Sequence, residues 1–263
     1  MTRILSGVAM AAAAFAVVWW LPSNVLLAVA VVVAALAFVE YARLVRAIGA
    51  KFPFVPALVA TLAACVVGAM PTTFGVMALP AFGLALLAVA VSLMLSGAHG
   101  APLVNGAATA MLAPLYIGLP LGALVAIHTV AGREGVITLV ATVAASDTFQ
   151  YYTGRTFGRR PLAPTISPKK TIEGAVGGFV FAPLALVALA RWSLPGVPPV
   201  AVWAVGLGLV VAGIAGDLFE SALKRAAGMK DSGDLIPGHG GVLDRIDALL
   251  FCAPPFAMLV WLS

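Results

Sequence analysis

Charged residues are scarce in this chain, and their scarcity excludes a soluble globular protein. Only 10% of the 263 residues are charged, whereas 62% are hydrophobic. A soluble domain has about 25% charged residues, because its surface must be covered in water. Lipid must therefore surround most of the chain, and inside a bilayer only helices or closed barrels satisfy the hydrogen bonds of the backbone.

Short alternating hydrophobic segments, which are typical of a β-barrel, are also missing. The apolar runs are long and rich in Ala, Leu and Val, which favours transmembrane helices. Cysteine is rare as well. Cys65 and Cys252 lie in separate apolar runs, and we expect each to be a small buried hydrophobic residue rather than a disulfide partner. The sequence thus predicts an all-α, polytopic integral membrane protein.

Nine apolar runs of about 20 residues are candidate membrane spans. They lie near residues 4–20, 24–41, 54–70, 75–95, 105–130, 134–152, 173–191, 199–216 and 243–262. We interpret the first as a retained helix rather than a signal peptide, because residues 19–22 (Trp-Trp-Leu-Pro) contain no small-residue cleavage site. Pro114 and Pro120 interrupt the fifth, which leaves open one kinked crossing or two short segments.

The distribution of positive charge predicts the orientation. With nine spans and a cytoplasmic N-terminus, only Arg133 and Arg191 of the 15 Lys and Arg residues fall outside the cytoplasmic side, as the positive-inside rule requires. The expected location is the inner (cytoplasmic) cell membrane, multi-pass, with a polar site facing the cytoplasm. The basic residues therefore reflect the orientation of the chain in the membrane, and we expect no nucleic-acid partner.

Negative charge is concentrated in the second half of the chain. Eight of the ten acidic residues lie after position 146, and no internal repeat or low-complexity linker is visible. We therefore treat residues 1–263 as a single membrane domain, in which residues 1–133 are mainly scaffold spans and residues 134–263 form the catalytic half.

Two polar segments open this catalytic half. Asp147 ends a long apolar run, where a carboxylate usually faces a bundle interior or a functional site; alternatively, it only marks the helix end. In the next segment, Ser167 and Thr171 are candidate N-caps beside Lys169 and Lys170. Hydroxyls and lysines at a helix N-terminus suit phosphate, although a basic loop could also only attract anionic lipid.

A third and more specific segment covers residues 216–247. One face of a helix would carry four of its polar residues, Asp217, Glu220, Ser221 and Lys224. Asp244 and Asp247 share a face at the start of the last span. Gathered carboxylates repel each other, and Mg²⁺, held by one or two carboxylates and substrate phosphates, would relieve this. The alternative is an ion-paired loop, with Glu220 and Lys224 as a surface pair.

The stretch from Ser221 to Asp247 resembles the signature of the phosphatidate cytidylyltransferase (CDP-diacylglycerol synthase) family. It reads S-x-L-K-R, four residues, K-D, and then P-G-H-G-G-V-L-D-R-I-D. The glycines of this turn let backbone approach a ligand closely. The resemblance extends over about residues 146–250 and departs from the family at Phe149-Gln150, where a small residue is usual.

The resemblance implies that CTP and phosphatidic acid give CDP-diacylglycerol and pyrophosphate. It implies a catalytic set of Asp217, Lys224, Asp231, His239, Asp244 and Asp247. It implies metal binding, of Mg²⁺ and a second cation, by Asp217, Asp244 and Asp247. It implies substrate binding by Asp147, Ser167, Lys169, Lys170, Thr171, Ser221, Arg225, Lys230, Gly240, Gly241 and Arg245.

Two other functions remain open. A CTP-dependent kinase of a membrane lipid alcohol would need a general base for its hydroxyl acceptor. A non-enzymatic transporter of anionic lipid would bind near the midplane, commonly between repeats, and no repeat is visible. The expected partners are CTP, phosphatidic acid and the lipid bilayer, with a homodimer as one candidate assembly.

Overall fold

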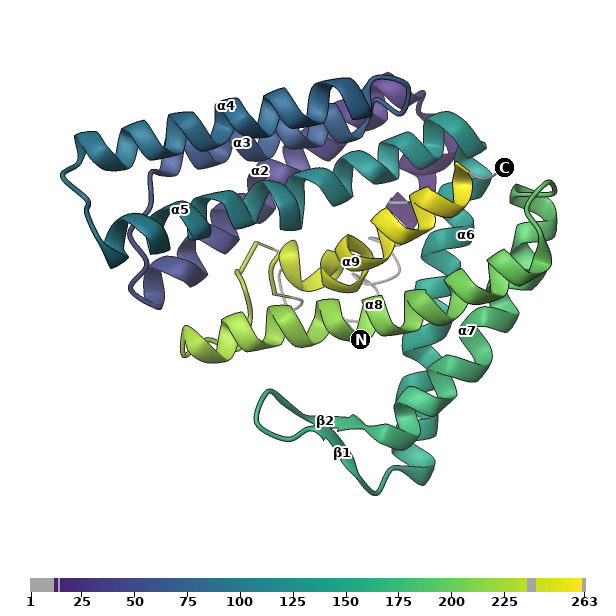
Figure 1. Cartoon of the computed structure of the whole chain (residues 1–263). Coiled ribbons are helices and arrows are strands. Elements are labelled where there is room, and N and C mark those ends of the chain that lie inside the picture. Colours follow the sequence, from purple (N-terminus) through teal and green to yellow (C-terminus); the bar gives the residue numbers. More distant parts are fainter. Residues whose placement is uncertain (1–11, 14, 236–239, 262–263) are drawn as a thin grey trace. The chain divides into compact units, whose positions relative to one another are not determined.

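The computed structural model describes residues 12–13, 15–235 and 240–261, and most of these are helical. The chain divides into two compact units (Figure 1). The first unit comprises residues Met1–Ala126 and Ala226–Arg245, and the second comprises Ile127–Arg225 and Ile246–Ser263. Each unit thus combines two segments that are separated in the sequence. The interpretation of residues 1–263 as one membrane domain, with scaffold spans up to residue 133 and a catalytic half after it, stays a prediction.

Four helices and one π-helical turn build most of the first unit. They are α2 (Ser23–Ala47), α3 (Phe54–Gly68), α4 (Phe74–Leu95), α5 (Ala101–Ala113) and η1 (Pro114–Gly118). Figure 1 shows the four helices side by side, and α3 contacts each of the other elements. Small residues let η1 approach α3 closely, as is common between membrane helices. A Cβ added at Gly118 of η1 would lie 2.9 Å from the Cβ of Ala64 in α3.

The two prolines of the fifth predicted span do not break it. α5 continues through η1 into α6 (Leu119–Phe157), so the structure favours one continuous helical path over two separate segments. α6 instead contains a kink at Gly132, whose φ of 69° and ψ of −174° are non-helical. Glycine tolerates a positive φ because it has no side chain. The kink falls between the fifth and sixth predicted spans.

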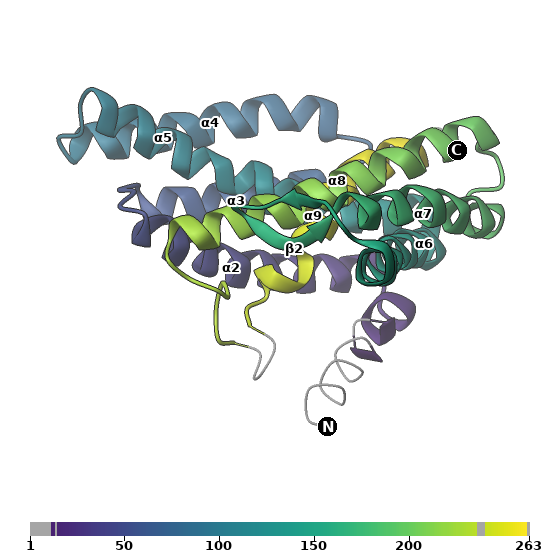
Figure 2. The ribbon, with the colours of Figure 1, turned by 90° about the horizontal axis from the view of Figure 1, so that it is seen from below.

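The second unit combines the later part of α6 with α7 (Ile172–Ser193), α8 (Pro199–Ala226) and α9 (Leu243–Val260). Figure 2 shows α7 alongside α6. The rings of Phe149 and Phe181 stack between these helices, with centroids 3.8 Å apart, so the departure at Phe149 is accommodated by packing. The thiol of Cys252 donates to the Leu209 carbonyl at 3.3 Å. Both cysteines are free and buried, as predicted.

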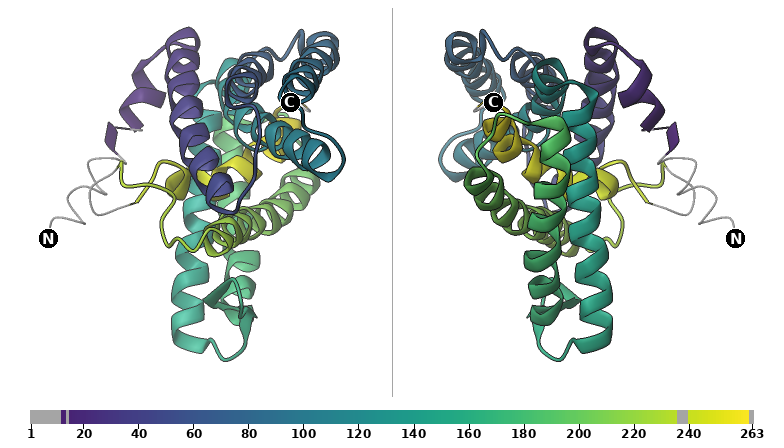
Figure 3. Two further views of the ribbon diagram at one scale, coloured as in Figure 1. Left: turned by 90° about the vertical axis from the view of Figure 1, so that its left-hand side faces the viewer. Right: turned by 90° about the vertical axis from the view of Figure 1, so that its right-hand side faces the viewer.

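A short antiparallel hairpin, absent from the all-α prediction, joins α6 to α7. It pairs β1 (Pro161–Ala163) with β2 (Ser167–Thr171) (Figure 3). The Oγ1 atom of Thr171 accepts a hydrogen bond from the Gly174 amide at 3.1 Å, which confirms Thr171 as the N-cap of α7. Ser167 is not a cap, because it begins β2 four residues earlier.

Among the described residues, five helical stretches are long and apolar enough to cross a membrane. They are Ser23–Ala47, Val76–Leu95, Ala101–Phe157, Ile172–Ser193 and Pro199–Ala226. α3 is a shorter apolar helix. The chain is therefore a helical, multi-pass membrane protein, whereas the total of nine spans stays a prediction.

Candidate active site

Three carboxylates from three helices of the second unit form what we call the carboxylate cluster. Asp147 lies in α6, Asp217 in α8 and Asp247 in α9. Each acts on the other two by Coulombic repulsion. Gly216 allows α8 and α9 to come close here, since a Cβ at this position would lie 3.2 Å from the Cα of Ala248. A concentrated negative charge of this kind calls for cations.

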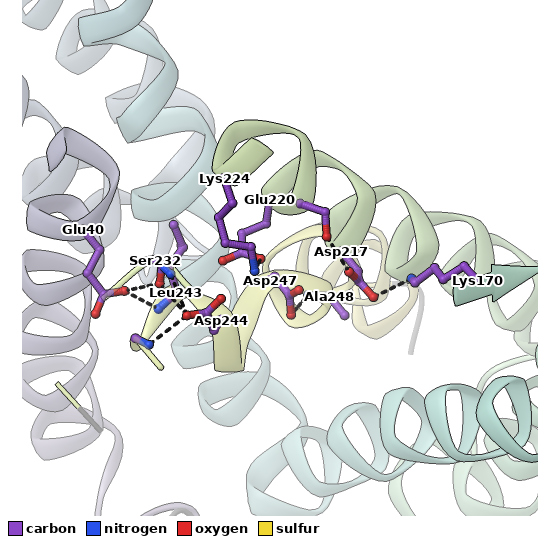
Figure 4. Close-up of polar contacts among 12 residues, drawn as sticks. Glu40, Lys170, Asp217, Glu220, Lys224, Ser232, Leu243, Asp244, Asp247 and Ala248 are labelled. Atoms are coloured by element: carbon purple, nitrogen blue, oxygen red, sulfur yellow. Dashed lines mark hydrogen bonds and ion pairs between the residues drawn. The ribbon is translucent and has the colours of Figure 1, made fainter. Parts of the chain in front are cut away.

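Two lysines supply part of that positive charge. Lys170, at the end of β2, places its Nζ 2.5 Å from Oδ2 of Asp217 (Figure 4). Lys224 acts on Asp247 electrostatically and also forms an ion pair with Glu220 one turn earlier in α8. Ser221 donates a long hydrogen bond of 3.3 Å to Oδ1 of Asp217. The polar face expected on this helix is therefore present.

The pair of Glu220 and Lys224 differs from the surface pair that the sequence offered as an alternative. The side chains are 1% and 13% exposed, so the pair is buried. The sequence could not show this, because the i, i+4 spacing is the same for buried and exposed pairs. Burial raises the cost of breaking the pair, since a charge left alone cannot be solvated.

Asp244 belongs to a second group of contacts, within the first unit. Its Oδ2 atom accepts hydrogen bonds from the Ser232 amide (2.8 Å), the Ser232 hydroxyl (2.9 Å) and the Gly241 amide (2.8 Å) (Figure 4). This oxygen therefore helps to fix the segment of residues 240–243, which we call the turn. A role for Asp244 as a metal ligand stays a prediction.

Sequence reasoning missed Glu40, which lies in α2 and is 7% exposed. Its carboxylate accepts hydrogen bonds from Ser232, Val242 and Leu243, and thus contacts the same turn as Asp244. One signal could have found it. Glu40 lies inside a long apolar run, where a carboxylate is costly and usually has a function, as at Asp147.

Exposed side chains are those of Lys169, Arg225, Lys230, Asp231 and Arg245. Gly240 has a φ of 82°, and a Cβ there would lie 2.6 Å from Oδ2 of Asp244, so a side chain would not fit. His239 lies outside the described residues.

The predicted metal ligands are divided between the units, since Asp217 and Asp247 belong to the second and Asp244 to the first. Within the described ranges, no group of three or more His, Cys, Asp or Glu side chains could hold a metal ion. Mg²⁺ commonly binds through one or two carboxylates and substrate phosphates rather than in a protein cage. Asp217 and Asp247 fit that mode, because both are hard oxygen donors in one cluster.

Comparison with known proteins finds relatives that match part of the chain. An uncharacterised Escherichia coli protein, YnbB, is 42% identical over 46% of this chain and 40% of its own length. Phosphatidate cytidylyltransferases of Helicobacter pylori and Bacillus subtilis are 42% and 40% identical, over 55% and 54% of this chain and 53% and 54% of their own lengths. The chain thus aligns with about half the length of these relatives. All of its residues, 1–263, match the sequence model of the cytidylyltransferase family, and the chain belongs to that family.

Proposed function

We propose that this protein is a phosphatidate cytidylyltransferase, which converts CTP and phosphatidic acid into CDP-diacylglycerol and pyrophosphate. The carboxylate cluster, with Lys170 and Lys224 beside it, is the observation that carries the proposal. Two relatives named phosphatidate cytidylyltransferase support it. An arrangement of acids and lysines in a membrane protein suits two phosphate-bearing substrates, one of them a lipid.

The proposed chemistry needs charge neutralisation more than proton transfer. The phosphate of phosphatidic acid is the nucleophile, and it is already ionised at neutral pH because the second pKa of a phosphate monoester is about 6. Lys170 and Lys224 bind and orient phosphate oxygens, and offset the charge that develops as pyrophosphate leaves. Asp217 and Asp247 would hold Mg²⁺, which supplies further neutralisation of the triphosphate.

The finer topology belongs to the same proposal. We place the N-terminus and the carboxylate cluster at the cytoplasmic face of the inner membrane, with nine spans, because that arrangement leaves only Arg133 and Arg191 on the other side. CTP would then reach the site from the cytoplasm and phosphatidic acid from the bilayer. A homodimer is a further expectation, to be measured by the mass of the purified protein in detergent.

Isotope labels in CTP test the reaction. Purified protein with phosphatidic acid and Mg²⁺ should move label from the α-phosphate of CTP into lipid and release the γ-label as pyrophosphate. Removing Mg²⁺ with a chelator should abolish turnover. A CTP-dependent kinase predicts the opposite, with γ-label in the lipid and CDP released, and that outcome would refute the proposal. Absence of any label transfer would favour the transporter instead.

A further inference from the structure

Glu40 contacts a part of the chain that is very distant in the sequence. Its Oε1 atom accepts a hydrogen bond from the Val242 amide, and its Oε2 atom accepts from the Leu243 amide and the Ser232 hydroxyl, each at 2.8 Å (Figure 4). The partners lie 192 to 203 positions later. All four residues belong to the first unit. The turn, residues 240–243, is therefore attached to α2 by one carboxylate.

Two of these bonds satisfy the start of α9. Leu243 is the first residue of that helix, and the first amides of an α-helix have no partner within it. A carboxylate is favoured there because the helix dipole is positive at its N-terminus. Glu40 thus supplies, from α2, acceptors for two amides at the start of α9. A carboxylate within an apolar helix is costly unless it is paired. Burying Glu40 with these three hydrogen bonds is therefore favoured over burying it without partners.

Ser232 links Glu40 to Asp244. It is fully buried, and its Oγ atom lies 2.8 Å from Oε2 of Glu40 and 2.9 Å from Oδ2 of Asp244. The hydroxyl has one proton, which the two carboxylate oxygens therefore share in a bifurcated hydrogen bond. Any displacement of Glu40 would shift Ser232, and with it the oxygen of Asp244 that accepts its amide and hydroxyl.

The glycines of this region leave room for the two carboxylates. A Cβ added at Gly233 would lie 2.7 Å from Oε1 of Glu40, and one added at Gly240 would lie 2.6 Å from Oδ2 of Asp244. A Cβ at Gly241 would collide with both Glu40 and Ser232. The absence of side chains here is thus required by the packing of Glu40 and Asp244, independently of any ligand.

We infer that Glu40 is a positioning residue of the cytidylyltransferase site: it fixes the turn of residues 240–243 and, through Ser232, the carboxylate of Asp244. Its catalytic effect rests on the proposed function, but its effect on the turn does not. The first half of the chain then contributes directly to the active site and is more than a scaffold.

Glu40→Gln tests the inference, because glutamine keeps the size but removes the charge and one acceptor. Hydrogen exchange followed by mass spectrometry should show residues 240–245 exchanging about tenfold faster or more, with residues 54–68 of α3 unchanged. The kcat for CDP-diacylglycerol should fall about 10- to 100-fold, the usual effect of removing a group that orients an active-site residue. The KM for CTP should change little.

Tyr41→Phe is the matched control. Tyr41 follows Glu40 in α2 and is also buried, and its hydroxyl donates to the Thr109 carbonyl at 2.8 Å, away from the turn. This variant should lose stability while exchange at residues 240–245 and kcat stay at wild-type values. If Glu40→Gln affects exchange and kcat no more than Tyr41→Phe does, Glu40 is only a packing residue and the inference is wrong.

If Glu40→Gln does not fold, Ser232→Ala tests whether Glu40 positions Asp244 through Ser232. It removes the hydroxyl that connects Glu40 to Asp244 but keeps the Ser232 amide bond to Asp244 and both bonds from Glu40 to the start of α9. The kcat should therefore fall while exchange of the Leu243 amide stays slow. An unchanged kcat would overturn the positioning role. A wild-type protein inactive with CTP would refute the proposed function instead, and the exchange comparison would still decide whether Glu40 orders the turn.

Discussion

Lys170 and Asp217 join β2 to α8 through a contact of 2.5 Å between Nζ and Oδ2. Asp217 is also repelled by Asp147 and Asp247, so the ammonium of Lys170 offsets part of this repulsion. Nucleotide and lipid phosphates would bring further negative charge to the same place. We infer that Lys170 exchanges the carboxylate for a phosphate oxygen when substrate binds, and that Asp217 is then available to a cation.

Lys170→Ala should therefore impair catalysis. A hydrogen bond to a charged group contributes about 1.5–3 kcal/mol, or roughly 10- to 150-fold. The loss should appear in kcat, in the KM of a phosphate-bearing substrate, or in both, because the charge is present in the ground state and in the transition state. Steady-state kinetics measure this. Arg155→Ala removes an exposed cation of the same unit and should have a small effect; equal losses would mean that only the net charge matters.

Asp217→Asn and Asp247→Asn should each remove most of the Mg²⁺-dependent turnover. The substitution keeps the size of the side chain and removes its charge, so the protein should fold. Loss of one preorganised electrostatic contact costs about 2.7–4 kcal/mol, or roughly 100- to 1000-fold in kcat. Titrating Mg²⁺ at saturating CTP measures the effect. Asp234→Asn, at a side chain that is 90% exposed, is the control, and near wild-type activity in both cluster variants would contradict the metal assignment.

Glu220→Gln should lower stability more than its spacing suggests. The variant removes the carboxylate that pairs with Lys224, whose side chain is only 13% exposed, and breaking a buried pair costs about 3–5 kcal/mol. Thermal unfolding in detergent should show a clear fall in Tm. The exposed pair of Arg43 and Asp234 provides the comparison, because Arg43→Gln should change Tm very little. Equal shifts would show that burial of Glu220 does not matter.

The orientation can be tested with single cysteines. In a background with Cys65→Ala and Cys252→Ala, Pro168→Cys and Asp234→Cys should react with a membrane-impermeant thiol reagent only from the cytoplasmic side. Thr72→Cys should react from the other side. All three positions are exposed. Labelling of Asp234→Cys from outside intact cells would overturn both the orientation and the cytoplasmic placement of the site.

The helices were largely predictable from the sequence, but their ends were not. Apolar runs predicted α3, α4 and α7 to within two residues, whereas the run at 24–41 ended six residues before the end of α2 at Ala47. The run at 199–216 predicted only part of α8, which continues to Ala226, because hydropathy marks the membrane and not the end of helical hydrogen bonding. The hairpin was missed since β1 has three residues and β2 contains proline and two lysines, which gives no alternating pattern.

The site was predictable where its residues are close in sequence. Ser221 and Lys224 follow Asp217 and Glu220 by one helical turn each, and helix geometry alone brings these pairs together. Glu40 could not be placed, because its partners lie about 200 positions away and only tertiary packing brings them together. The sequence also could not predict that Asp244 and Asp247 belong to different units, because both lie in one continuous helix.

The double role of Thr171 limits how Lys170 can move. Thr171 ends β2 and caps α7 at the same time, and Glu173 fastens the other side of the hairpin by accepting hydrogen bonds from the Arg159 and Arg160 amides. A swing of the hairpin as a flap would unwind the first turn of α7. If Lys170 exchanges Asp217 for phosphate as we infer, the exchange must therefore occur by rotation about its four-carbon side chain. This motion is fast and requires no opening of the backbone.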